Sequence, residues 1–215
     1  MRALPAVVLA ALALCAGAAA HNLPPGTKNP YSSAVIFISP PAKGIYAAVL
    51  GQDDRLWIDN PERVPLVVLG YQGEPYLRFG KAGVYRNANS PATYVNRQRY
   101  GLAPVPKSAR ADATPKWVLV SRTETYQWHD HRIHWMSTIP PNVVRQDASK
   151  PHHVFNWRVP ILVGGKRHTI VGTLDYTPPA KQGGSKLAVI VAVVLTLIAI
   201  AGAVIAVRVL RRRAA

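Results

Sequence analysis

The residues of this chain best suited to chemistry are its histidines, which gather in the second half of the sequence. Six of the seven lie at positions 129, 131, 134, 152, 153 and 168, and three of these fall in one run, 128–136 (WHDHRIHWM). In a strand, His129 and His131 would project from the same face. Imidazole suits Cu(II) and Zn(II), and a thioether such as that of Met136 suits Cu(I). The run therefore favours a metal site, with copper as the expected ion.

The seventh histidine, His21, follows a segment with the features of a signal peptide. Arg2 supplies a positive charge, residues 3–14 form an apolar run, and residues 18–20 are alanines of the kind that signal peptidase accepts. We expect residues 1–20 to be removed, which leaves His21 at the new N-terminus. An uncleaved anchor and a lipoprotein modified at Cys15 are the alternatives. A terminal histidine can chelate one Cu(II) through its amine and its imidazole.

The expected metal ligands come from these two places. They are His21, His129, Asp130, His131, His134 and Met136. A purely structural interpretation competes with this one. Tryptophans flank the run, so its histidines also fit a packed corner in which Asp130 and Arg132 form an ion pair, and Met is more often a core residue than a ligand. The spacing matches no closed Cys/His zinc pattern. The remaining histidines, at 152, 153 and 168, are expected to be structural or solvated.

The C-terminal region reads as a membrane anchor. Residues 187–207 contain no charged residue, and 21 residues of helix cover roughly 30 Å, the thickness of the hydrocarbon layer. Four arginines follow within 208–215, and the positive-inside rule places that tail in the cytoplasm. We expect a single-pass protein of the plasma membrane, with residues 179–186 as a stalk and the N-terminal domain outside.

Composition narrows the function of the exported part. The whole chain carries a net charge of +16, and removal of Arg2 and the four tail arginines leaves +11. Such a surface favours anionic neighbours, namely lipid head groups, cell-wall polymers or acidic proteins. The cations are scattered and no nucleic-acid motif accompanies them, so no nucleic-acid partner is expected. No serine-hydrolase, phosphate-loop or His-Glu-x-x-His motif is present, and the single cysteine, Cys15, lies in the signal segment. We expect no enzyme and no disulfide.

The segment between the two apolar ends is rich in short β-type runs. Residues 21–32 read as an extended arm, and nine runs separated by turn signals follow, at 34–39, 45–50, 55–58, 65–69, 76–79, 117–121, 126–128, 154–162 and 169–176. Residues 154–163 and 166–176, joined by Gly164-Gly165, form the clearest hairpin. Residues 33–178 are thus expected to be an all-β domain, an Ig-like antiparallel β-sandwich, with one C-terminal transmembrane helix added.

Two connecting segments have distinctive compositions. Residues 85–100 are rich in Asn, Arg and Tyr, and read as an ordered loop pinned to the sandwich or as a recognition surface for a glycan or protein. Residues 100–115 are rich in Pro and Ala and are expected to be a surface excursion.

Three segments carry a resemblance to a known family. Residues 70–78 (GYQGEPYLR), 90–94 (SPATY) and 128–136 resemble a family of exported single-pass proteins of Gram-positive actinobacteria, over roughly residues 34–207. This resemblance implies an architecture and no activity. A narrower similarity, limited to the post-signal His21 and the His/Asp element, links the chain to CopC-type copper carriers. It implies copper held jointly by the terminus and the 129–136 segment.

Together these features predict a membrane-anchored, extracytoplasmic binding module that holds copper through its His-rich segment. The alternative is a structural or protein-interaction domain of the cell envelope that holds no metal, with an envelope protein as its partner.

The N-terminus provides the first test. N-terminal sequencing of the purified native protein should give His21 as the first residue, because small residues at 18 and 20 direct cleavage there. An Ala20→Arg variant should remain unprocessed. Any other start in the native protein would remove the terminal chelate from the site.

Overall fold

The computed structural model describes residues 29–179, 190, 191, 193–195 and 197. The chain divides into two units, Met1–Pro178 and Pro179–Ala215, and each is considered by itself. Several predicted segments lie outside the described residues: the signal peptide 1–20 with His21, most of the arm 21–32, nearly all of the stalk 179–186, and the tail 208–215. Most of the predicted membrane helix 187–207 also lies outside them.

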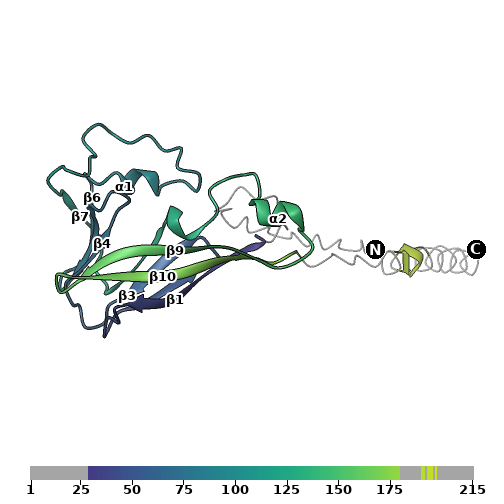
Figure 1. Cartoon of the computed structure of the whole chain (residues 1–215), viewed down its shortest axis with the longest axis horizontal. Helices are drawn as coiled ribbons and strands as arrows, with labels where there is room; N and C mark the ends of the chain where they lie inside the picture. Colours follow the sequence, from purple (N-terminus) through teal and green to yellow (C-terminus); the bar gives the residue numbers. More distant parts are fainter. Residues whose placement is uncertain (1–28, 180–189, 192, 196, 198–215) are drawn as a thin grey trace, which may run out of the picture. The chain divides into compact units, whose positions relative to one another are not determined.

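Ten strands of residues 29–179 form two antiparallel sheets (Figure 1). In spatial order, the larger sheet contains β1 (Tyr31–Ser39), β10 (Lys166–Tyr176), β9 (His152–Val163), β4 (Leu66–Leu69), β5 (Pro75–Gly80), β6 (Gly83–Asn87) and β7 (Trp117–Ser121). The smaller sheet contains β2 (Tyr46–Leu50), β3 (Arg55–Asp59) and β8 (Thr125–His129). Three short helical segments interrupt the strands: α1 (Ala92–Val95), η1 (His131–Ile133) and α2 (Asn142–Gln146). The prediction of an all-β, sandwich-like domain is confirmed at this level.

The two sheets share one core, which explains why the strands alternate as they do. In β3, Leu56 and Ile58 are fully buried, and in β4 Leu66 and Val68 are fully buried, so each strand turns alternate residues inward. Side chains from both sheets belong to a single apolar cluster, which includes Trp128 of the smaller sheet. The burial of this cluster is the main favourable contribution to folding in a domain without disulfides.

All nine predicted β-runs coincide with strands. The predicted hairpin is β9–β10, and its turn residues Gly164 and Gly165 have φ angles of 55° and 81°. A two-residue turn with both φ angles positive matches the twist of the flanking strands, which is why the Gly-Gly pair belongs there. The predicted excursion at 100–115 contains no helix or strand.

The segment 85–100 differs from the prediction at its start. Residues Gly83–Asn87 form β6, and Val84 is fully buried in the core. The polar composition of Arg86 and Asn87 hid this strand. The rest is an ordered segment pinned to the sheet, as predicted, and it includes the single turn of α1. The Thr93 hydroxyl donates to the Asn87 carbonyl of β6 at 2.6 Å, and the Asn87 amide donates to the Pro75 carbonyl of β5 at 2.8 Å.

Trp157 joins the three strands at one edge of the larger sheet. Its indole N–H, on β9, lies 2.8 Å from the Ser33 hydroxyl oxygen on β1 and 3.0 Å from the Thr173 carbonyl oxygen on β10. The ring lies directly over Gly172, where a Cβ atom would be 2.1 Å from the ring and 2.3 Å from the Ala34 carbonyl oxygen. A glycine at position 172 is therefore a packing requirement.

In the second unit, residues 190, 191, 193–195 and 197 are helical. Among the described residues, no helix combines the length and the apolar character that crossing a bilayer requires.

Gly172→Ala should lower the free energy of unfolding by about 1–3 kcal/mol, because the added methyl group forces Trp157 or the β1 backbone to move. Urea denaturation of the full-length protein measures this loss. Gly80→Ala is the matched control, since its Cβ would meet nothing within 4 Å, and it should change stability by less than about 0.5 kcal/mol. Equal effects of the two substitutions would contradict the packing role.

Candidate metal centre

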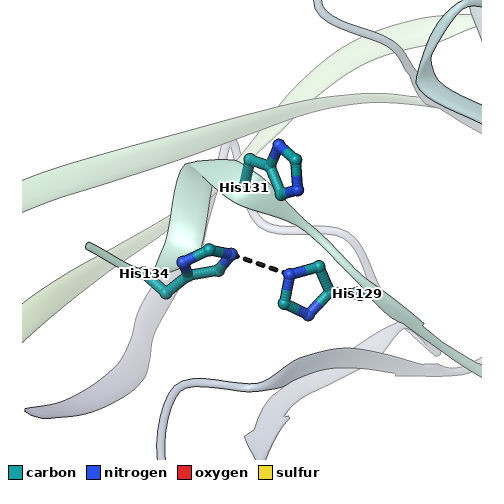
Figure 2. A group of neighbouring side chains, drawn as sticks. All are labelled: His129, His131 and His134. Carbon is teal, nitrogen blue, oxygen red and sulfur yellow. Dashed lines mark hydrogen bonds between the residues drawn. The ribbon is translucent and has the colours of Figure 1, made fainter. Parts of the chain in front are cut away.

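Three of the predicted ligands come together at the end of the smaller sheet. His129 is the last residue of β8, His131 opens η1, and His134 follows it. One ring nitrogen from each lies within 4.8 Å of those of the other two, so the three imidazoles could hold a metal ion. Figure 2 shows the three rings grouped together, with the hydrogen bond that joins His134 to His129.

A short 3₁₀ turn produces this convergence. The sequence predicted that His129 and His131 share one face of a strand, but β8 stops at His129. Asp130 then caps η1, since its carboxylate accepts a hydrogen bond from the Arg132 backbone N–H at 3.1 Å. The turn reverses the chain within a few residues, and so His134 returns to His129. An extended strand could not have gathered all three residues.

The rings are close and nearly buried. The centroid distances are 4.5 Å between His129 and His134, 5.3 Å between His129 and His131, and 5.4 Å between His131 and His134. Only 1% of His134 and 9% of His131 is exposed. Bulk solvent hardly reaches these nitrogens, so each of them needs a partner in the protein, a buried water or a bound ion.

Hydrogen bonds fix the tautomers of His129 and His134. His129 Nδ1 lies 2.8 Å from the Asp54 carbonyl oxygen and 3.1 Å from its carboxylate, and His134 Nδ1 lies 3.2 Å from the Trp135 carbonyl oxygen. A carbonyl oxygen only accepts, so each Nδ1 carries a proton. In the neutral rings both Nε2 atoms then carry lone pairs, and these two atoms are 2.9 Å apart. Two facing lone pairs require a cation between them, either a proton or a metal ion.

His131 is held differently. Its Nε2 lies 2.6 Å from the Gln98 carbonyl oxygen, so that nitrogen donates and the lone pair resides on Nδ1. Its backbone N–H donates to the Tyr71 hydroxyl at 3.0 Å. The ring therefore has one strong protein partner, which ligation through Nε2 would have to replace.

The surroundings oppose positive charge on the rings. Burial lowers the pKa of His134 to about 3, with nearby Arg99 and the other two histidines adding to the effect. Burial also lowers the pKa of His131, assisted by the proximity of His129 and Arg99. Both rings are therefore neutral at physiological pH, which is the form that binds metals.

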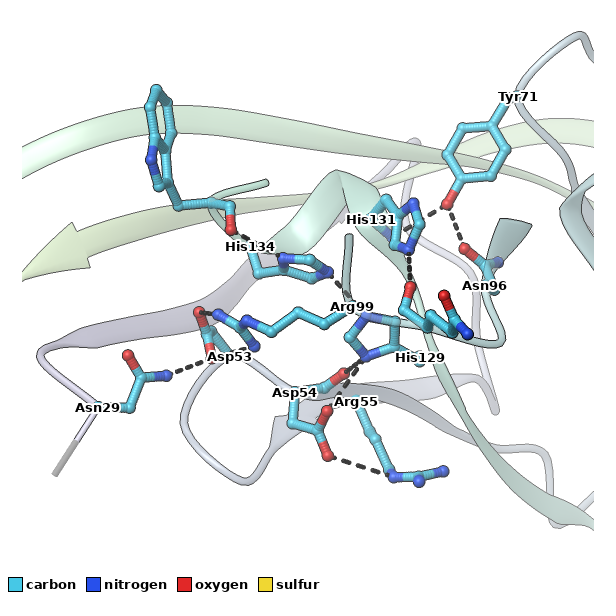
Figure 3. A network of polar contacts seen from close by, with 12 residues as sticks. Asn29, Asp53, Asp54, Arg55, Tyr71, Asn96, Arg99, His129, His131 and His134 are labelled. Atoms are coloured by element: carbon cyan, nitrogen blue, oxygen red, sulfur yellow. Dashed lines mark hydrogen bonds and ion pairs between the residues drawn. The ribbon is translucent and has the colours of Figure 1, made fainter. Parts of the chain in front are cut away.

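A charged network lies beside the triad (Figure 3). Arg99 forms two hydrogen bonds to the fully buried Asp53, at 2.7 and 3.2 Å, and the Asn29 amide donates to the same carboxylate at 2.5 Å. Asp54, behind His129, lies 3.3 Å from the Arg55 guanidinium. Each carboxylate thus has a cationic neighbour, and the Asp53–Arg99 pair anchors the 96–101 segment over the histidines.

The other predicted ligands are not members of the triad. Asp130 is fully buried, and its two oxygens accept bonds from the Arg132 side chain at 2.7 and 2.8 Å and from the Trp128 indole at 2.8 Å. Burial alone would raise the pKa of Asp130, but the charge and hydrogen bonds of Arg132 outweigh this and hold it below its usual range. Met136 is 36% exposed, and its methyl group lies beside Gly101, as does His131. His21 lies outside the described residues.

The remaining histidines have other partners. His152 Nε2 lies 2.5 Å from the Asp147 carbonyl oxygen, His153 Nδ1 lies 2.9 Å from the Asp175 carboxylate, and His168 Nδ1 lies 2.8 Å from the Pro40 carbonyl oxygen. None of them belongs to the triad.

Sequence reasoning missed Asp54, Gln98 and Arg99, which orient or surround the imidazoles. Asp54 is 75 positions from His129 in the chain, and Gln98 is 33 positions from His131. Local spacing in the sequence therefore does not reveal these neighbours. The run of acidic residues at 53–54 beside a strand was the one available signal.

Searches with protein-family models, among curated proteins and among solved structures find no match to this chain.

The buried Asp130–Arg132 pair can be tested against a matched surface pair. Asp130→Asn should lower the free energy of unfolding by about 3–5 kcal/mol, because Arg132 would be left buried without its counter-charge. Asp112→Asn breaks an exposed pair with Arg110, in which the partners are also two residues apart, and should leave the denaturation midpoint unchanged. Similar midpoints for both variants would show that the buried pair does not hold the turn.

Proposed function

We propose that this domain is a copper-binding module in which His129, His131 and His134 hold the ion. The observation that carries the proposal is the convergence of three nearly buried imidazoles, two of which direct Nε2 atoms at each other across 2.9 Å. A shared proton would satisfy two of these nitrogens. The third imidazole, on the same side, favours an ion that accepts several ligands at once.

The contacts behind the rings support the same interpretation. Metal-binding histidines usually donate their second ring N–H to a carboxylate or a carbonyl group, which fixes the tautomer and the ring orientation. The Nδ1–H of His129 donates to the carbonyl and the carboxylate of Asp54, and the Nδ1–H of His134 donates to the Trp135 carbonyl. Metal–nitrogen bonds of about 2.0–2.1 Å in a tetrahedral arrangement place ligand nitrogens about 3.4 Å apart. A modest approach of His131 would reach that spacing.

Copper is the ion that we propose because of the ligand chemistry. All three groups are imidazoles, and copper(II) binds nitrogen sites more tightly than the other common divalent ions. Met136, whose methyl group lies beside Gly101 as the His131 ring does, offers a thioether that suits Cu(I). Asp130 contributes by capping the turn that carries the ligands rather than through a bond to the ion.

His21 remains a proposed fourth ligand. Asn29, the first described residue, already bonds to Asp53 beside the triad. His21 lies eight positions before it, and an extended chain of that length spans at most about 28 Å. The terminal amine and imidazole can therefore reach the three histidines once the signal peptide is removed.

The proposed setting is the outer face of the plasma membrane. In this proposal the domain is an Ig-like form of the sandwich, tethered by one transmembrane helix at 187–207, with the basic tail inside. It acts by binding rather than by catalysis, in keeping with the resemblance to exported actinobacterial proteins. The charge of +11 on the residues outside the signal and tail suits an anionic envelope.

A second function, an envelope interaction domain without metal, draws support from one observation. Each of the three histidines already has a hydrogen-bond partner within the domain, so the triad can be satisfied as a packed corner. Copper titration separates the two functions.

The full-length chain in phosphatidylcholine nanodiscs should bind about one copper ion per protein, and it should hold Cu(II) or Cu(I) more tightly than Zn(II). The double variant His129→Ala/His131→Ala should weaken copper binding by at least about a hundredfold, because two of three imidazole ligands are lost. Competition with a chelator of known affinity gives the constants.

The double variant His153→Ala/His168→Ala removes two histidines outside the triad and is the control. It should keep the native affinity. Unchanged copper binding in the 129/131 variant would exclude the site, and tighter binding of Zn(II) than of either copper ion would exclude the metal assignment.

A further inference from the structure

A separate hollow lies on the outer face of the larger sheet, near the tip of the β9–β10 hairpin. Its volume is about 370 Å³, at the small end of the range of about 300–1,000 Å³ for small-molecule pockets. The residues that shape it are Val67, Arg78, Gly80, Lys81, Tyr85 and Leu162. None of these belongs to the histidine triad.

The hollow exists because glycines stand where side chains would fill it. Gly80 of β5 and Gly165 of the hairpin turn both line it, and a Cβ atom at either position would meet nothing within 4 Å. Gly80 follows Arg78 by two residues and so faces the same side of the sheet. Its backbone is not in the left-handed region, so a larger residue could occupy position 80 without strain.

The hollow lies along a row of cross-strand neighbours, in which Leu162 and Val67 form the apolar floor and Arg78 reaches the rim. Leu162, Val67, Arg78 and Tyr85 are direct cross-strand partners on β9, β4, β5 and β6. They face away from the core, whose residues Leu66, Val68 and Phe79 alternate with them. Most of the exposed wall area is apolar.

The rim is cationic, and one cation is held in place. The Arg78 guanidinium lies 4.9 Å from the centre of the Tyr85 ring and 4.7 Å from that of Trp117, an arrangement of the cation–π type. Within residues 29–179, neither Arg78 nor Lys81 forms an ion pair with a carboxylate. The guanidinium N–H groups are therefore available to an anion, in a position that two aromatic rings fix beforehand.

We propose that this hollow binds a free, monomeric amphiphile with an alkyl chain and a single carboxylate. The alkyl chain lies over Val67 and Leu162 in the space left by Gly80. The carboxylate pairs with Arg78 and Lys81. Apolar walls alone would accept any alkyl compound, and the unpaired cations at one rim select the anionic one.

Octanoate is the probe. Equilibrium dialysis of the full-length chain in phosphatidylcholine nanodiscs, with empty nanodiscs as the blank, should show saturable binding of about one octanoate per protein. Octanol and octylamine have comparable chains without the negative charge, and they should bind at least about tenfold more weakly.

Two variants separate shape from charge. Gly80→Ile should abolish octanoate binding by filling the hollow, while the denaturation midpoint stays level or rises, because a β-branched residue suits a strand. Arg78→Gln should weaken binding by about tenfold through the loss of a charge-assisted hydrogen bond. Arg158→Gln, which removes an exposed arginine farther along β9, is the matched control and should bind as the native protein does.

Native octanoate affinity in Gly80→Ile, or equal binding of octanol and octanoate, would overturn the proposal. Binding of the protein to intact anionic vesicles, without binding of dissolved octanoate, would also overturn the proposal, because the hollow would then recognise a bilayer surface and not a free amphiphile. Copper binding is measured on the same samples and is expected to be unchanged in all three variants, so the two sites can be judged independently.

Discussion

The buried ion pair between Asp130 and Arg132 is the interaction on which the candidate site depends. The pair lies where β8 ends and the chain turns. The Asp130 carboxylate accepts hydrogen bonds from the Arg132 side chain, from the Arg132 backbone N–H and from the Trp128 indole. A carboxylate so deep in the domain is tolerated only because every lone-pair direction is used. By capping the 3₁₀ turn, this pair determines that His131 and His134 return toward His129.

Distant segments then complete the site. The turn before β3 supplies Asp54 behind His129. The 96–101 segment supplies the Gln98 carbonyl that bonds to His131 Nε2, and it places Arg99 near His134. Asp53 and Arg99 join these two segments through a two-bond ion pair. The Nε2 atoms of His129 and His134 are therefore oriented before any ion arrives, and preorganised ligands lose little entropy on binding, whereas His131 has to give up its bond to Gln98 to join them through Nε2. The neutral form that burial enforces on His131 and His134 is also the form that coordinates metals.

The division of the domain into two sheets separates the two candidate binding regions. The triad follows the last strand of the smaller sheet, whereas the cationic hollow lies on the outer face of the larger one. The hollow uses the alternation of the strands, which commit one face to the core and leave the other free, whereas the triad depends on the turn that follows β8. The strand pairs that bury Leu66 and Val68 also align Val67 with Arg78 and Leu162.

Much of the architecture was determined by the sequence alone, because strand signals are local. Alternating apolar residues and β-branched side chains located nine strands, and Gly164-Gly165 located the hairpin turn. The run 128–136 likewise identified the three histidines. The sequence also offered the Asp130–Arg132 ion pair, as part of the structural interpretation, and the pair is present. Only the tertiary structure decided that Asp54, Gln98 and Arg99 surround the imidazoles, and that Gly80 leaves a hollow beside Arg78. These contacts join residues that are far apart in the chain or depend on which face is covered, and chain spacing encodes neither.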